Sequence, residues 1–128
     1  MEPGRTASIR AYIGNDVYDL KLGLGEIMEF EDRTGVGCMF AMVALADNTH
    51  TWKSSYISEA LRLGLKGAHP NSNPVEWTKL IDTYVGGEGG FLLDYKEVAA
   101  QLLYAAVGGP KDEPIEAEED SGEPVPKA

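Results

Sequence analysis

The chain has 128 residues, 43% of them hydrophobic, with 11 Lys and Arg against 21 Asp and Glu. This length predicts one domain with its own hydrophobic core. The net charge of −10 argues against a phosphate-neutralising nucleic-acid surface and against binding to anionic membranes. The single cysteine, Cys38, leaves no internal disulfide, which fits a reducing compartment. The longest uncharged apolar run, Val36–Ala46, is shorter than the roughly 20 residues of a membrane span. With no visible signal peptide, we expect a cytoplasmic protein.

Half of the net negative charge lies at the C-terminus. Residues 110–128 hold seven acids, two lysines and four of the seven prolines, with no aromatic residue. Such a segment buries too little apolar area to offset its ordering entropy. The sequence therefore predicts a flexible N-terminus at 1–7, a folded domain at 8–109 and a disordered acidic tail at 110–128. Docking of this tail to a basic partner is the functional alternative.

The first predicted element of the folded part is a β-hairpin. Residues Ser8–Ile13 and Val17–Leu22 alternate apolar and polar side chains on either side of Gly14-Asn15-Asp16. A lone hairpin is marginal in water, so helices are expected to cover it. The segment Leu24–Thr34 has helical spacing, and Gly35 is placed to close that helix in the left-handed conformation.

Two further helices are expected in the middle of the chain. Val36–Ala46 is nearly all apolar, and a helix that is apolar all round is normally buried. The segment from Thr51 to Leu65 has apolar residues at helical spacing, and Gly67 is predicted to end it.

Capping residues indicate where the last two helices begin. Asn73 followed by Pro74 is a strong helix start. Residues 86–90 form a glycine-rich break that lacks the lysine of a phosphate-binding loop. Asp94 is predicted to cap the final helix, with Glu97 three residues later. The expected fold class is α+β: a hairpin followed by a small bundle of four to five short helices.

No catalytic, metal or cofactor constellation is visible. His50 and His69 are expected in solvated turns, and Cys38 lies in an apolar helix where a buried, inert thiol is the default. A Cys38–His69 couple has no support in the sequence. Glu26 and Glu29 could face a metal, but a solvated acidic face is the usual outcome. We therefore predict a non-enzymatic protein without cofactors.

Two groups of apolar side chains remain as candidates for partner binding. Methionine surfaces adapt to varied apolar partners, yet core packing is the favoured interpretation for the 36–46 helix. Aromatic residues at helical spacing on the next two helices allow the same two interpretations. The candidate partner-binding set is Met39, Phe40, Met42, Trp52, Tyr56 and Trp77.

The order and spacing of these elements resemble the tail assembly chaperone family of tailed phages and gene transfer agents. The resemblance covers roughly residues 8–108. It rests on the acidic helix end Phe30–Gly35, the segments Ile57–Leu65 and Pro74–Asp82, and the Ala-rich helix Val98–Val107. The long apolar 36–46 segment and the acidic tail depart from the family pattern.

The resemblance implies a chaperone that binds the tape measure protein, with other tail proteins as further candidate partners, in the bacterial host cytoplasm before the tail tube polymerises. Met39, Phe40 and Met42, or the aromatic faces of the next helices, would then supply the binding surface. Neither nucleic acid nor membrane is an expected partner, and a homo-oligomer is possible. The main alternative is a minor structural or tail-completion protein of the particle. A small enzyme and a regulator that mimics DNA are further alternatives.

Overall fold

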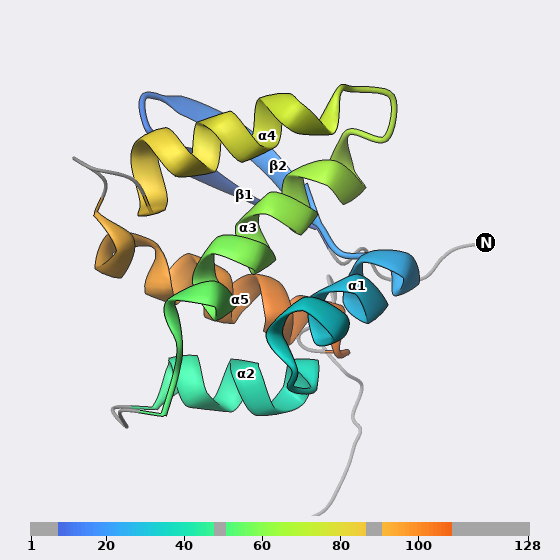
Figure 1. Cartoon of the computed structure of the whole chain (residues 1–128), viewed down its shortest axis with the longest axis vertical. Helices are drawn as coiled ribbons and strands as arrows, with labels where there is room; N and C mark the ends of the chain where they lie inside the picture. Colours follow the sequence, from blue (N-terminus) through green and yellow to red (C-terminus); the bar gives the residue numbers. More distant parts are fainter. Residues whose placement is uncertain (1–7, 48–50, 87–90, 109–128) are drawn as a thin grey trace, which may run out of the picture.

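The computed structural model describes residues 8–47, 51–86 and 91–108. In these ranges the chain forms an N-terminal hairpin followed by five α-helices, which confirms the predicted α+β class (Figure 1). The predicted flexible N-terminus, the acidic tail at 110–128, His50 and most of the glycine-rich break lie outside the described residues. The predicted domain boundaries therefore stay predictions.

The hairpin pairs β1 (Ser8–Ile13) with β2 (Asp16–Lys21) in antiparallel register. Gly14 sits in the two-residue turn with φ 67°, a left-handed conformation that favours glycine. The Gly14 amide donates a 3.1 Å hydrogen bond to the Tyr95 hydroxyl, far along the chain. Ile13 and Leu20 are buried, so one face of the hairpin rests on the helices as expected.

Helix α1 (Leu24–Thr34) has the predicted bounds. At its start the Gly23 amide donates to the Glu26 carboxylate at 2.9 Å, which satisfies a backbone donor beside the helix. At its end Gly35 adopts φ 78° and donates to the Glu31 carbonyl, as the sequence indicates.

Helix α3 (Ser54–Ala68) is the central element, packed against β2, α1, α4 and α5 (Figure 1). Gly67 lies inside this helix, so the prediction that it ends the helix is wrong. A Cβ at Gly67 would overlap the carbonyl oxygen of Lys21. The glycine is thus explained by the close approach of α3 to the end of β2.

Helix α4 (Pro74–Ile81) begins as predicted, because the Asn73 side chain accepts a 3.0 Å hydrogen bond from the Val75 amide. It continues into a π-turn, η1 (Asp82–Gly86).

Helix α5 (Lys96–Ala106) follows a 3₁₀ turn, η2 (Leu92–Tyr95). The prediction that Asp94 caps the last helix is wrong, since Asp94 lies inside η2 and α5 begins without a side-chain cap. Tyr95, held to the hairpin turn through its hydroxyl, occupies the position before α5.

Helix α2 (Cys38–Ala46) packs against α5 at the end of the molecule opposite α4 (Figure 1). The core extends from this end to the hairpin. Its largest fully buried side chains are Tyr56, Phe30, Ile13, Leu20, Leu45, Ile57, Leu61, Leu63, Leu65, Leu102, Leu103 and Val85.

Candidate functional site

Helix α2 is apolar on every side yet buried on only one. Its buried side chains are small or slender: Cys38, Ala41, Ala44 and Leu45. At 100° per residue, Met39, Phe40 and Val43 fall on the opposite face, with exposed fractions of 56%, 54% and 45%. We call these three residues the ridge. The favoured expectation that this helix is interior is therefore wrong for the ridge face, because α2 is an outer element with α5 on one side.

A groove opens between α2 and α5 beside the ridge. It has a volume of about 630 Å³, which lies within the range of pockets that bind small molecules. Its lining is mainly apolar, and the charged side chains in it are one lysine and one glutamate. The lining residues are Met42, Leu45, Ala46, Leu93, Lys96, Glu97, Ala100, Gln101 and Tyr104. At 100° per residue, Met42 lies on α2 between the buried face and Met39, so the groove flanks the Met39 side of the ridge.

The structure separates the six candidate partner-binding residues. Met39 and Phe40 are on the ridge and Met42 lines the groove, whereas Tyr56 is a core residue only 1% exposed. Trp52 is partly buried against the core. Their role in partner binding stays a prediction, and of the six only the three α2 residues lie on the ridge or in the groove.

Trp77 has evident partners inside the chain. Its ring meets Tyr18 edge-on at 6.0 Å between centroids, and its indole N–H donates to the Ser72 hydroxyl at 2.9 Å. These contacts tie α4 to the hairpin and to the α3–α4 turn.

Sequence reasoning missed three large exposed apolar residues of the ridge and groove: Val43, Leu93 and Tyr104. Leu93 is 66% and Tyr104 48% exposed. Tyr104 could have been found, because it follows two inward-facing leucines on α5 and so must turn outward. Leu93 lies in the 3₁₀ turn, which the expected helix start at Asp94 concealed.

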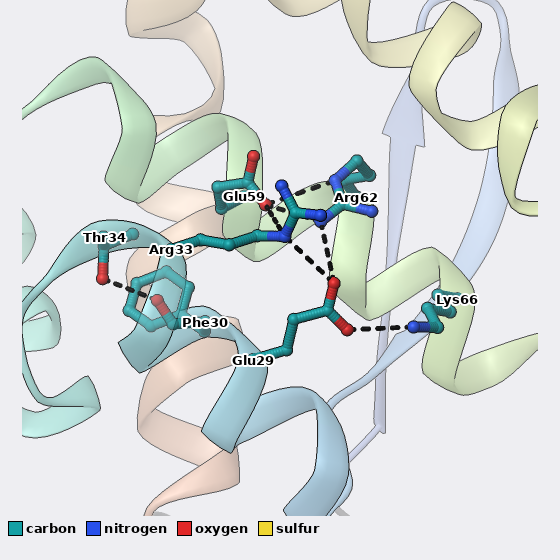
Figure 2. A network of polar contacts seen from close by, with 7 residues as sticks. All are labelled: Glu29, Phe30, Arg33, Thr34, Glu59, Arg62 and Lys66. Atoms are coloured by element: carbon teal, nitrogen blue, oxygen red, sulfur yellow. Dashed lines mark hydrogen bonds and ion pairs between the residues drawn. The ribbon is translucent and has the colours of Figure 1, made fainter.

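The strongest polar cluster joins α1 to α3 (Figure 2). Glu29 receives hydrogen bonds from Lys66 at 2.9 Å, from Arg33 at 3.0 Å and from Arg62 at 3.4 Å. Arg62 also donates to Glu59 at 2.7 Å. The hydrogen bond from Lys66, helped by the two arginines, lowers the pKa of Glu29 to about 2. The cluster is thus an internal bridge between two helices, and we call it the α1–α3 network.

Three of the four carboxylates of α1 bind donors within the chain rather than a metal. Glu26 accepts from the Gly23 amide, and Glu31 accepts from the Cys38 amide at 2.9 Å. Within residues 8–47, 51–86 and 91–108, no group of three His, Cys, Asp or Glu side chains could hold a metal ion.

The cysteine and the described histidine have separate surroundings. Burial, with a smaller effect of the Glu31 charge, raises the pKa of the Cys38 thiol to about 11. A thiol of this pKa is protonated at neutral pH and is a poor nucleophile. The His69 ring lies 5.0 Å from the Trp77 ring, and its Nδ1 is 2.9 Å from the Leu65 carbonyl oxygen.

In the described part of the chain, every helix is too short or too polar to cross a bilayer.

Comparison with known proteins places the chain in a phage context. A family model described as "Phage tail tube protein, GTA-gp10" matches residues 6–109. No curated protein and no solved structure matches the chain. The match confirms the expected phage or gene transfer agent context. It overturns the expected function, because the family is described as a structural tail protein and not as an assembly chaperone for the tape measure protein. The chain belongs to the phage tail tube protein family GTA-gp10 and is a tail protein of the phage or gene transfer agent type.

Proposed function

We propose that the chain is a non-enzymatic structural component of a phage or gene transfer agent tail. It joins other tail proteins through the apolar surface formed by the ridge and the groove. The observation that carries this proposal is the exposure of Met39, Phe40 and Val43 on a helix without a single charged residue. Contiguous exposed apolar surface on a protein of this size is typical of protein–protein contacts.

The family description supports the structural role, and the chemistry of the described residues is compatible with it. Glu29 of α1 forms ion pairs with Arg62 and Lys66 of α3, and the thiol of Cys38 is protonated and buried. Apolar burial is the main favourable term in stable assembly. A tail protein that contacts its neighbours through α2 would use this term without having to desolvate a charge of its own on that helix.

The test is the composition of purified particles. Tails from the bacterium that encodes the chain are purified and assayed by quantitative mass spectrometry for the wild-type protein and for Phe40→Glu. We expect the wild-type chain in stoichiometric amounts and Phe40→Glu depleted at least roughly tenfold, because a buried unpaired carboxylate is costly. Val75→Glu is the matched control, since Val75 is 55% exposed on α4. Finding the wild-type chain in the lysate but not in intact particles would refute the structural role.

A further inference from the structure

The outer edge of β1 carries backbone groups that β2 does not use. Ile13 pairs with Asp16 across a two-residue turn, so these two residues exchange both of their backbone hydrogen bonds. Bonding to β2 then falls on every second residue of β1. Arg10 and Tyr12, which lie between the bonded positions, point their N–H and C=O groups away from β2. Among the described residues, none forms a hydrogen bond with these four groups.

The two outer edges of the hairpin have different surroundings. The Lys21 carbonyl oxygen lies where a Cβ of Gly67 would be, so α3 passes directly against this end of β2. The main helix contact of β1 is with α5. Ile9 and Ala11 face inward and pack on the core, so this contact lies on the inner face of the hairpin. The edge at Arg10 and Tyr12 points in another direction.

The β1 edge is held in place and carries no unpaired charge. The Gly14 amide bonds to the Tyr95 hydroxyl and fixes the turn beside this edge. A fixed strand loses little conformational entropy when it binds a partner. Charged side chains often protect a strand edge from pairing, but the Arg10 guanidinium bonds to Asp19 of β2 at 3.0 Å. The Tyr12 ring beside it is 67% exposed.

We propose that the β1 edge binds an extended segment of another protein, which adds a third strand to the hairpin. The unused donors and acceptors of Arg10 and Tyr12 repeat at the two-residue period of a strand, so a main chain in extended conformation satisfies them. The side chains of that segment alternate, and those that lie beside Ile9 and Ala11 are apolar. Because this chain has a net charge of −10, the segment is neutral or basic.

The bound segment belongs to a neighbouring tail protein, and in this respect the inference rests on the proposed function. A component of a repeating assembly contacts its neighbours through two different surfaces. The hairpin lies at the α4 end of the molecule and α2 at the opposite end (Figure 1). The β1 edge therefore supplies a second contact without covering the ridge or the groove.

The first experiment measures hydrogen exchange of single backbone amides in the purified chain and in purified tails. In the free chain, the Arg10 and Tyr12 amides should exchange at least roughly 100-fold faster than those of Ile9 and Ala11, which bond to β2. In tails, the two edge amides should slow at least roughly tenfold, because each gains a hydrogen bond. Edge amides that exchange equally fast in tails would overturn the proposal. Edge amides already slow in the free chain would assign the edge to another segment of this chain.

The second experiment removes one edge donor without touching the ladder. Proline is tolerated in a strand where the N–H faces outward, so Tyr12→Pro should leave the β1–β2 bonds intact. The matched control is Val17→Pro, which changes the opposite residue and removes a donor from the outer edge of β2. Urea unfolding of both variants verifies that they fold.

The readout is the amount of each variant in purified tails. We expect Tyr12→Pro to be depleted at least roughly tenfold, because an added strand would lose a main-chain bond and meet the proline ring. Val17→Pro should enter like the wild type. Tyr12→Val keeps the amide and loses only the ring, so it should be depleted by no more than about threefold. Wild-type levels of a folded Tyr12→Pro would overturn the proposal.

The two proposals fail in different ways. A chain present in tails with unprotected edge amides would refute strand addition and leave the structural role standing. A chain missing from intact tails would refute the structural role, and with it a tail protein as the source of the added strand. Protected edge amides together with normal incorporation of Phe40→Glu would support the β1 edge and refute α2 as the contact surface.

Discussion

The α1–α3 network and the ridge of α2 use their side chains in opposite ways. In the network, Glu29 and Glu59 meet Arg33, Arg62 and Lys66 of the same chain (Figure 2). On the ridge, three large apolar side chains are about half exposed. The difference shows that some acidic side chains of the folded part serve to join helices through ion pairs. Helix α2, which has no charged residue, exposes apolar side chains instead.

The largest expected effect distinguishes the buried face of α2 from its exposed ridge. Ala41 is fully buried against the core and Val43 is 45% exposed on the ridge. Ala41→Asp should lower the free energy of unfolding by more than about 4 kcal/mol or prevent folding, because it buries an unpaired carboxylate. Val43→Asp should change it by less than about 0.5 kcal/mol. Urea unfolding of both variants at low protein concentration measures the difference, and equal losses would show that α2 is not anchored by its Ala41 face.

The network should respond to arginine removal in proportion to burial. The Arg62 side chain is 14% exposed and the Arg33 side chain 53%. Arg62→Ala should cost about 2 kcal/mol, because it leaves two partly buried carboxylates short of donors. Arg33→Ala should cost less than about 0.5 kcal/mol. Urea unfolding checks both values.

The α1–α3 network should also contribute to the pH dependence of the free energy of unfolding. The pKa of Glu29 in the folded chain, about 2, lies below its ordinary value of 4.5. Ionised Glu29 therefore stabilises the fold above pH 4.5, and this contribution is lost as the pH falls through 4.5 toward 2. Between pH 6 and pH 3 we expect Glu29 to account for about 1 kcal/mol, allowing for the solvent screening of a partly exposed group.

The measurement is the difference between wild type and Glu29→Gln in urea unfolding at the two pH values, which removes the titration of the other acids. Glu29→Gln should lose less stability on acidification than the wild type. Parallel losses in the two proteins would exclude Glu29 as the source.

The elements that local rules govern were predictable from the sequence. Gly35 closes α1, and Asn73 with Pro74 opens α4, because a cap depends on residues within one turn. The residues around Gly67 do not explain why a glycine is needed there. The need arises because the carbonyl oxygen of Lys21, on β2, lies where a Cβ at position 67 would be. The network was equally hidden from local rules. Glu29 meets Arg62, which is 33 positions further along the chain, and Lys66, which is 37 positions further.

The candidate surface was predictable in composition but not in geometry. Met39, Phe40 and Met42 stood out as an uncharged apolar group. An all-apolar helix, however, gives no periodic signal for its buried side. Only the position of α5 decides that Ala41 is interior and Phe40 is not. The same limit applies to Tyr56, whose helical spacing fits both a groove and the core in which it lies.

The smallest expected effect concerns the exposed ion pair of the hairpin. Arg10 and Asp19 are cross-strand partners 3.0 Å apart, with side chains 72% and 53% exposed. Arg10→Ala should change the free energy of unfolding by less than about 0.5 kcal/mol, because water and salt screen an exposed pair. Urea unfolding at low and high salt, beside Arg62→Ala, provides the comparison. A loss at Arg10 as large as that at Arg62 would mean that charge alone, and not burial between helices, gives the α1–α3 network its strength.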